Sequence, residues 1–480
     1  MSGAYEAVIG LEIHVQLSTR TKMFCGCELS FGDEPNVHTC PVCLGHPGTL
    51  PTLNEQAIHY ALMIAAALGC EVPPLNEFAR KNYFYPDLPK GYQISQFDKP
   101  IAVGGSFADV GITRAHLEED AAKLTHVGAS GRIHGSGHSL VDFNRGGTPL
   151  VEIVTEPDIR SAAQAREWAQ LLRATIRQLG VSDVNMEEGS LRADGNISLR
   201  PEGSEELGVK TELKNMNSFR FLERGIEAEL ERQREILESG EAVVQQTLHF
   251  HPEDGSLTPL RSKEYAHDYR YFPEPDLVPV APTEAMLAAA REAMPELPLA
   301  RRDRYIEQVG IPAEAAATLA FQAEYAEFFE RALEAGDGAS AKAIANWVTG
   351  ELVAALRDAG DVDPGDSKAT PEAVAALAGM VESKAISHGS GKRVLSKLVA
   401  DGGDPAAIVE AEGLGQISDS GELEKIVDAA IEAEPEAAEQ VRQGNQKAIG
   451  RIMGFVMKET QGRADGGAVQ KLIRGRLGAG

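Results

Sequence analysis

Residues 8 to 17 alternate between apolar and polar side chains. The apolar parity consists of Ile9, Leu11, Ile13, Val15 and Leu17. The polar parity consists of Gly10, Glu12, His14 and Gln16. Such alternation predicts a strand with one buried face. Glu12 and His14 therefore project together from the opposite face, separated by roughly 7 Å along the strand.

Similar strand-like patterns occupy residues 140–156 and 190–200. Two amphipathic helices are predicted between and after them, over residues 161–179 and 219–238, because apolar residues recur there at helical spacing. Gly180 and Gly240 follow these helices and are typical of helix ends. The first 290 or so residues thus predict an α+β domain built on a large, mostly antiparallel sheet.

The pattern changes after the proline-rich stretch 271–282. From Pro295 the chain is rich in Ala and Glu, and its caps and glycines predict a series of short helices. Glycine-rich stretches at 400–405 and 412–415 suggest a last boundary. We therefore expect a sheet domain over residues 1–294, a helical domain over 295–410 and a small helical tail domain over 411–480.

Composition fits an ordinary globular protein, with 480 residues, 43% hydrophobic and 25% charged. The net charge of -26 argues against a broad nucleic-acid surface. The last 37 residues differ, because they carry seven Lys/Arg against Glu459 and Asp465, which makes them net +5. This segment either contacts RNA phosphates or is the solvated face of a helical bundle.

The longest apolar run, residues 60–69, is half the length that a bilayer requires and predicts a buried helix. The first residues lack the basic and apolar stretches of a secretory signal. Cytoplasmic location is the resulting expectation.

Four of the five cysteines are close in sequence, namely Cys25, Cys27, Cys40 and Cys43. Four thiolates at this spacing suit a tetrahedral zinc ion, and a site closed by four cysteines is structural because it leaves no position for water. The alternative is four unrelated buried thiols. Cys70 is expected to be a small buried hydrophobic residue.

Carboxylates recur on strand-like stretches, as Glu118, Glu119, Asp120, Glu152 and Asp194. Acidic groups among Val, Ile and Leu are unfavourable unless they are paired or bind a cation. Two interpretations stay open on spacing alone. The carboxylates bind Mg²⁺ with a nucleotide phosphate, or they form ion pairs with Arg145, Arg192 and Lys214.

Residues 78–96 mix cations with aromatic side chains, and residues 209–219 form a second polar stretch. Mixed cations and aromatics either stack a nucleotide base and hold phosphates or pack in a core. The sequence has no G-x-x-x-x-G-K-[ST] phosphate loop and no G-x-S-x-G nucleophile motif. Glutaminase or protease machinery is therefore not evident.

The chain resembles, from end to end, the B subunits of the aspartyl/glutamyl-tRNA amidotransferases, the GatB family. The motifs that carry the resemblance are G-L-E-I-H-V-Q-L, F-C-G-C to C-P-V-C-L-G-H-P-G, R-K-N-Y-F-Y-P-D-L-P-K-G-Y-Q-I-S-Q, H-L-E-E-D-A-A-K, L-V-D-F-N-R-G-G-T-P-L-V-E-I-V-T-E-P-D, E-E-G-S-L-R-A-D-G-N-I-S-L-R-P, T-E-L-K-N-M-N-S-F and D-Y-R-Y-F-P-E-P-D-L.

The resemblance implies an ATP- and Mg²⁺-dependent ligase that acts on Glu-tRNA(Gln), Asp-tRNA(Asn) or both. The side-chain carboxylate is phosphorylated, and ammonia then displaces phosphate to give the amide. Ammonia is expected from glutamine hydrolysed by a separate amidase, the A subunit of the complex. A small C subunit is expected to hold the A and B subunits together. Which tRNA is the cellular substrate stays open.

The family's functional residues map onto positions of this chain. The resemblance implies a magnesium and catalytic cluster of Glu12, His14, Glu119 and Glu152. Glu119 is preferred to Glu118 because it matches the second glutamate of the E-E-D motif, and His14 binds either metal or phosphate. Lys81, Arg192, Asp194, Lys210 and Glu212 are expected around ATP. The cysteines match the zinc-binding members, and tRNA contacts are expected from Lys447, Arg451, Lys458, Lys471 and Arg474.

Overall fold

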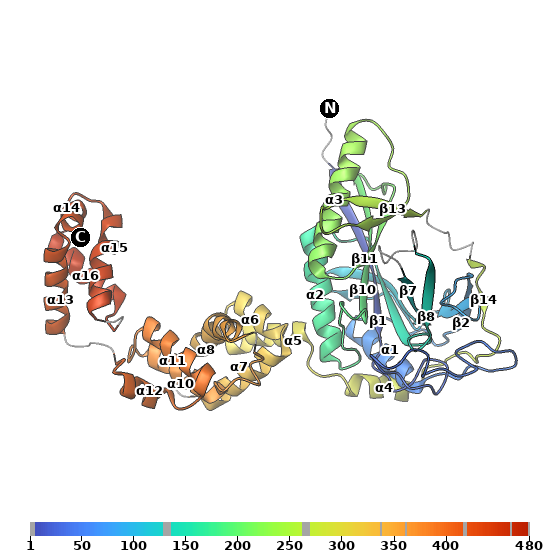
Figure 1. Ribbon diagram of the computed structural model, residues 1–480, viewed down its shortest axis with the longest axis horizontal. Helices are drawn as coiled ribbons and strands as arrows, with labels where there is room; N and C mark the ends of the chain where they lie inside the picture. The colour runs from blue at the N-terminus through green and yellow to red at the C-terminus, as the bar shows by residue number, and fades with distance from the viewer. Residues whose placement is uncertain are drawn as a thin grey trace. The chain divides into compact units, whose positions relative to one another are not determined.

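The computed structural model describes residues 5–127, 136–261, 269–336, 338–360, 362–415, 420–460 and 463–478. Contacts along the chain separate two compact units, residues 1–297 and 298–480. The first is an α+β unit and the second is helical (Figure 1). The predicted fold class is therefore confirmed.

The first unit is organised around one large sheet. Its strands follow the order β13-β12-β11-β10-β1-β9-β6-β4, and β5 pairs with β6. All pairs are antiparallel except β11 with β12. The strands are β1 (Tyr5–Gln16), β4 (Ala102–Val103), β5 (Ser106–Phe107), β6 (Val110–Glu119), β9 (Pro149–Thr155), β10 (Leu191–Pro201), β11 (Thr211–Met216), β12 (Thr247–Phe250) and β13 (Leu257–Arg261).

Two smaller sheets accompany the large one. A three-stranded sheet has the order β14-β2-β3, and β7 pairs with β8 in a hairpin. Their strands are β2 (Phe78–Asn82), β3 (Tyr92–Gln96), β7 (Lys123–Val127), β8 (His138–Asp142) and β14 (Phe272–Pro273). The helices of this unit are α1 (Glu55–Ala67), α2 (Ala162–Gln178), α3 (Phe219–Glu238) and α4 (Glu284–Glu292).

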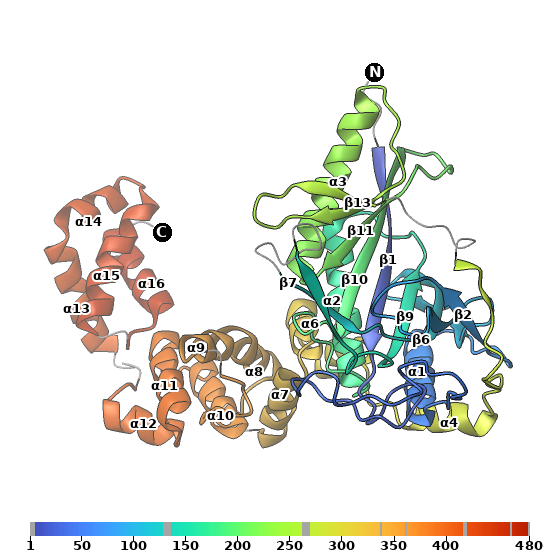
Figure 2. The ribbon, with the colours of Figure 1, turned by 45° about the vertical axis from the view of Figure 1, so that its right-hand side comes forward.

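Helices α2 and α3 pack beside each other on one face of the large sheet (Figures 1 and 2). Each begins at a serine whose side chain accepts a hydrogen bond from the first turn, Ser161 for α2 and Ser218 for α3. Their apolar stripes, with Trp168 and Ile226 fully or almost fully buried, cover the apolar parity of the strands. The side chains of the other parity, including Glu12 and His14, lie on the opposite face of the sheet.

The second unit contains short helices with two hydrophobic clusters. One cluster extends from Tyr305 to Leu414 and the other from Leu423 to Leu477. The α-helices among its described residues are α5 (Pro298–Arg304), α6 (Ala313–Ala320), α7 (Ala323–Ala335), α8 (Ala341–Asn346), α9 (Val353–Asp358), α10 (Pro371–Glu382), α11 (His388–Asp401), α12 (Pro405–Glu412), α13 (Ser420–Ala433), α14 (Pro435–Arg442), α15 (Ile449–Glu459) and α16 (Gly466–Leu477).

Helix boundaries agree closely with the sequence pattern, and the strand-like stretch 140–156 contributes to two strands. Residues 140–156 form the end of β8, a turn and then β9, because Gly146 and Gly147 interrupt the strand and Gly147 has a φ of 91°. The division expected at residue 410 stays a prediction. No helix among the described residues is long and apolar enough to span a membrane.

Candidate functional site

Strand β1, which carries the polar parity, lies in the middle of the large sheet, between β10 and β9 (Figure 2). Antiparallel register places His14 opposite Glu152 of β9 on one side and opposite Arg192 of β10 on the other. The next strand, β6, places His116 opposite Glu152. Side chains directly opposite on neighbouring strands share a face. The register thus assembles histidines and carboxylates from three strands on one surface.

Four side chains form the His/Glu cluster, defined as His14, His116, Glu118 and Glu152. His14 Nε2 lies 3.4 Å from Glu152 Oε2 and 3.7 Å from Glu118 Oε1. His116 Nε2 lies 3.3 Å from Glu152 Oε2 and 3.7 Å from Glu118 Oε2. His14 is the most accessible member, with 20% of its side chain exposed, against 4% for Glu118. Each carboxylate is therefore shared by both imidazoles.

The electrostatics of this cluster favour charged forms despite burial. Burial alone lowers the pKa of His116, but Glu152 and Glu118 outweigh it and raise that pKa to about 9. The pKa of His14 is also raised, since the same carboxylates offset the effect of burial. Burial alone raises the pKa of Glu152, yet the two histidines hold it well below its ordinary value. Without a cation, the imidazoles thus act as the counter-charges of the carboxylates.

The cluster has the donor atoms that a divalent cation needs. One ligand atom each from His14, Glu118 and Glu152 can be chosen so that all three lie within 4.8 Å of one another. Adjacent ligands of octahedral Mg²⁺ are about 3 Å apart and opposite ones about 4.2 Å apart. Small side-chain movements would bring these atoms onto one ion. The two carboxylate oxygens suit Mg²⁺, whereas the imidazole nitrogen is a less usual ligand for it.

Lys81 lies beside the cluster, on β2. Burial alone lowers its pKa, but Glu118, with smaller contributions from Tyr271 and Glu152, raises the pKa above its ordinary value. Its ammonium also lies 4.9 Å from the centre of the Tyr269 ring. A lysine whose charged form is favoured, beside two carboxylates and the Tyr269 ring, is suited to hold a phosphate.

A second group of polar residues, the β10–β11 group, lies next to the cluster on the same face. Glu12, which was expected in the magnesium cluster, lies in this group instead of among the His14, Glu118 and Glu152 ligand atoms, and Asn196 Nδ2 donates to its Oε1 over 2.8 Å. Lys214 Nζ lies 3.1 Å from Asp194 Oδ2 and 3.2 Å from Glu212 Oε1. The ammonium of Lys214 thus joins the carboxylates of β10 and β11. Of the residues expected around ATP, Asp194 and Glu212 are brought together here.

Arg192 also lies on this face, on β10 opposite His14. Its Nη2 donates to Asp120 Oδ2 over 2.9 Å, and Gln16 Nε2 donates to the same oxygen over 2.7 Å. Asp120, immediately after β6, therefore fixes the Arg192 guanidinium. Lys210, in contrast, is an exposed residue just before β11.

The structure contradicts the expected place of Glu119. Strand alternation sends Glu118 to the face of His14 and His116, so Glu119 points to the other side. There, Lys90 Nζ lies 2.7 Å from Glu119 Oε1, and the backbone N–H of Ile94 donates to the same oxygen over 3.0 Å. Glu118, not Glu119, is the member of the His/Glu cluster.

Sequence reasoning also missed His116 and Lys214. The signal for His116 was present, because His116 and Glu118 are two residues apart in H-L-E and so share a strand face. Lys214 was considered only as an ion-pair partner. Its position between two carboxylates depends on the pairing of β10 with β11, which no local pattern specifies.

The cysteine cluster lies at a separate place in the first unit. Ligand sulfurs of Cys25, Cys27, Cys40 and Cys43 all lie within 4.8 Å of one another, and those of Cys40 and Cys43 are 3.9 Å apart. Tetrahedral zinc with Zn–S bonds of about 2.3 Å requires sulfurs about 3.8 Å apart. The four side chains therefore fit a tetrahedral metal ion.

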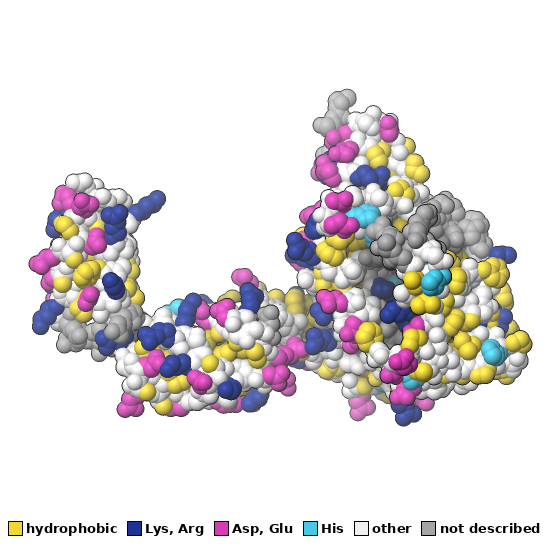
Figure 3. Space-filling view, viewed as in Figure 1, with side chains coloured by type: hydrophobic (Ala, Val, Ile, Leu, Met, Phe, Trp, Pro, Cys, Tyr) yellow, Lys and Arg dark blue, Asp and Glu magenta, His cyan; other side chains and the backbone are white. Residues whose placement is uncertain are grey.

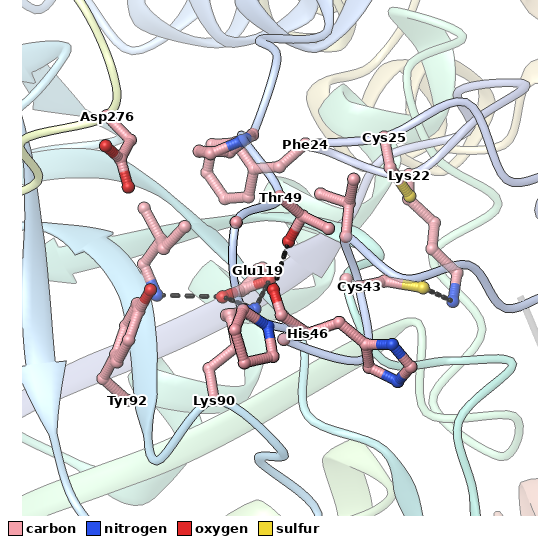
Figure 4. A pocket seen from close by; sticks show the side chains of 17 residues that line it. Lys22, Phe24, Cys25, Cys43, His46, Thr49, Lys90, Tyr92, Glu119 and Asp276 are labelled. Carbon is pink, nitrogen blue, oxygen red and sulfur yellow. Dashed lines mark hydrogen bonds and ion pairs between the residues drawn. The ribbon is translucent and has the colours of Figure 1, made fainter.

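A cavity of about 230 Å³ lies between this cluster and β3 (Figure 4). Its walls include Cys25 and Cys43 on one side and the Lys90–Glu119 pair on the other. Lys22 also lines it and points toward Cys43 (Figure 4). The cavity does not contain the His/Glu cluster.

The basic residues expected to contact tRNA lie on the last helices. Lys447, Arg451, Lys458, Lys471 and Arg474 are all exposed. Arg476 differs, because it forms ion pairs with Glu424 and Asp428 of α13. Basic and acidic side chains are interspersed on this surface (Figure 3). The cationic residues are thus accessible but do not form a uniformly basic face.

Comparison with known proteins is consistent with this architecture. Residues 7–288 match the family model of the GatB/GatE catalytic domain, and residues 327–477 match that of the GatB domain. Similar proteins include the B subunit of the aspartyl/glutamyl-tRNA(Asn/Gln) amidotransferase of Moorella thermoacetica, 48% identical over 98% of this chain and 100% of the relative. The proteins of the same name from Brevibacillus brevis and Persephonella marina are 48% and 47% identical. Each alignment covers 98% of this chain, with 98% and 99% of the respective relative.

The catalytic-domain match covers more than half of the chain and includes the whole His/Glu cluster and the cysteines. The relatives match over nearly their full length. On this evidence the chain belongs to the GatB family.

Proposed function

We propose that the chain is the B subunit of a glutamine-dependent aspartyl/glutamyl-tRNA(Asn/Gln) amidotransferase, a carbon–nitrogen ligase that works within a multi-subunit complex. The observation that carries the proposal is the His/Glu cluster beside Lys81, inside the segment that matches a catalytic domain. The substrate is Glu-tRNA(Gln), Asp-tRNA(Asn) or both, and the reaction takes place in the cytoplasm.

The chemistry requires an activated carboxylate. An oxygen of the side-chain carboxylate attacks the γ-phosphorus of ATP, and the bond to the ADP oxygen breaks. Ammonia then attacks the acyl carbon of the resulting acyl phosphate, inorganic phosphate leaves and ammonia loses a proton. Phosphoryl transfer depends mainly on positioning and on neutralising charge. The polar sheet face, which carries the His/Glu cluster and the β10–β11 group, supplies both functions without a protein nucleophile.

The cluster has the ligands for the cation that this reaction uses. Glu118 and Glu152 would hold Mg²⁺ through their oxygens, with His14 at its edge, and the ion would neutralise phosphate charge. His116 lies against both carboxylates and orients them. Lys81, on the same side, would pair with a phosphate oxygen.

The β10–β11 group has a different part in the proposal. Glu12, Asp194 and Glu212 surround the Asn196 amide and the Lys214 ammonium, which gives a rigid polar wall next to the cluster. Arg192, held by Asp120, adds a cation on β10 opposite His14. We assign these residues, with Lys210 at the rim, to binding ATP and the acceptor end of the tRNA.

Protein partners and the second metal complete the proposal. Ammonia comes from an amidase, which is the A subunit of the complex, and a small C subunit stabilises the assembly. Zn²⁺ occupies the four-cysteine cluster, where it has a structural role, because four protein ligands leave no position for substrate.

The other candidate function is a tRNA-binding adaptor without chemistry, which the exposed basic residues of α15 and α16 favour. The experiment uses the complete complex with misacylated tRNA, ATP and ammonium chloride. We expect ADP and amidated tRNA in equal amounts. Binding of tRNA without tRNA-dependent ADP formation would reject the ligase and favour the adaptor.

We expect tRNA affinity to depend on the five exposed basic residues of the last helices. Changing Lys447, Arg451, Lys458, Lys471 and Arg474 together to Gln should weaken binding and reduce its salt dependence, by about 0.7–0.9 in log–log slope for each phosphate that is no longer neutralised. Binding is measured at several KCl concentrations. Lys425→Gln, an exposed change on α13, is the control. Unchanged affinity and slope in the fivefold variant would mean that these five residues face solvent and do not contact tRNA.

A further inference from the structure

Lys22 is one of the most buried side chains of the chain, although lysine is normally exposed. Its relative exposure is 1%. Within the described residues, the Nζ atom has two partners, the carbonyl oxygen of Phe143 at 2.9 Å and Cys43 Sγ at 3.7 Å, and it forms no ion pair with a carboxylate. A buried ammonium is costly without a counter-charge. The sulfur is the partner that can supply one.

A neutral thiol does not compensate a buried ammonium, but a metal–thiolate centre does. A zinc ion with four thiolates carries two net negative charges. Cys43 Sγ, the sulfur next to Lys22, also accepts a hydrogen bond from the backbone N–H of Cys40 over 3.2 Å. Cys43 is therefore the ligand on which positive charge and donors converge (Figure 4).

We propose that Lys22 is the buried counter-ion of the metal–thiolate centre and that it connects this centre to the loop of residues 143–147. The inference rests on the proposal that the cysteine cluster holds zinc. Lys22 acts through Cys43 and the loop, so it is a positioning residue and not a catalytic one. Its ammonium neutralises negative charge at Cys43 on one side and donates a hydrogen bond to the carbonyl oxygen of Phe143 on the other.

The connected loop leads directly to the polar sheet face. Besides the Lys22 contact with Phe143, the backbone N–H of Met23 donates to the Gly147 oxygen over 2.8 Å. Arg145, between these two points, donates to the carbonyl oxygens of Ala121 and Ala122 and lies 3.7 Å from Asp120. Asp120 is the residue that holds Arg192. The metal centre thereby stabilises one edge of the proposed ATP-binding face.

The first test compares zinc release from the wild-type complex with that from Lys22→Met and Lys22→Gln. Met keeps the apolar volume without charge, and Gln keeps a donor without charge. We expect zinc affinity, measured by competition with a chelator, to fall by about 10–100-fold in both variants. Lys99→Met removes a lysine that is 43% exposed and pairs with Glu77, so it should leave zinc affinity unchanged.

The absorption spectrum of the Co²⁺-substituted protein separates a charge effect from a packing effect. A nearby ammonium lowers the energy of the sulfur electrons. The sulfur-to-cobalt charge-transfer band should therefore move to longer wavelength in both Lys22 variants. An unchanged band with unchanged zinc affinity would overturn the counter-ion role.

Labelling of wild-type lysines with acetic anhydride keeps the test decisive if a Lys22 variant fails to fold. We expect Lys22 to be unreactive with zinc bound and labelled after chelation, while Lys99 is labelled in both states. Amide exchange at Gly147, whose N–H donates to the Asp120 oxygen over 2.8 Å, should also accelerate on chelation. Protection of Lys22 and Gly147 that does not depend on zinc would contradict the inference. Wild-type protein that contains no zinc would instead reject the zinc proposal itself.

Discussion

Glu152→Gln is expected to reduce ATP-dependent amidation of misacylated tRNA by about 10²–10³-fold. Glu152 is the residue that joins the cluster, because its carboxylate lies within 3.4 Å of both His14 and His116 and is also a candidate metal ligand. The amide keeps nearly the same shape but removes the negative charge that binds a cation and raises both histidine pKa values. Amide and ADP formation are measured in the complete complex.

Binding of tRNA to this variant should stay close to wild type, since the basic residues of the last helices are unaffected. Glu156→Gln is the matched control, because Glu156 is an exposed glutamate just after β9 that accepts a hydrogen bond from Thr113. Its turnover should change by less than about twofold. Wild-type turnover by Glu152→Gln would show that the His/Glu cluster does not take part in the reaction.

The neighbouring glutamates Glu118 and Glu119 should give opposite phenotypes. Glu118→Gln removes a ligand from the cluster, so we expect Mn²⁺, used as a probe for Mg²⁺, to bind at least about tenfold more weakly. Glu119→Gln breaks a pair in which Lys90 is 11% and Glu119 is 3% exposed. We expect the free energy of unfolding to fall by about 3–5 kcal/mol. Mn²⁺ titration and denaturant unfolding measure the two effects.

Each variant is the control for the other, since both remove one charge from adjacent positions. Glu119→Gln should bind Mn²⁺ like the wild type wherever it is folded. Weakened Mn²⁺ binding in Glu119→Gln together with normal binding in Glu118→Gln would reverse the assignment and make Glu119 the metal ligand, as the E-E-D motif predicts.

The sequence was sufficient for the elements whose signals are local. The apolar periodicity of residues 161–179 and 219–238 located α2 and α3, and Gly180 and Gly240 mark their ends. Alternation along residues 8 to 17 correctly separated the face of Glu12 and His14 from the buried face. The apolar run 60–69 lies in the buried helix α1 and the residues just after it.

The composition of the site could not be predicted in the same way, because it depends on strand order. Glu152 faces His14 only because β9 pairs with β1, and His116 enters only because β6 is the next strand. The expectation that Glu119 belongs to the cluster, where the structure has Glu118, has another origin. The motif match favours Glu119, whereas strand parity places Glu118 on the face of His116.

The proposed role of the polar sheet face is to activate the substrate carboxylate by phosphoryl transfer. The most direct measurement uses misacylated tRNA with ¹⁸O in the side-chain carboxylate, incubated with the complete complex, ATP and ammonium chloride. Mass spectrometry of the released phosphate should find one ¹⁸O transferred for each amide formed, and Glu152→Gln should abolish both products. Amide formation with no ¹⁸O in the phosphate would show that the carboxylate is not activated by phosphoryl transfer.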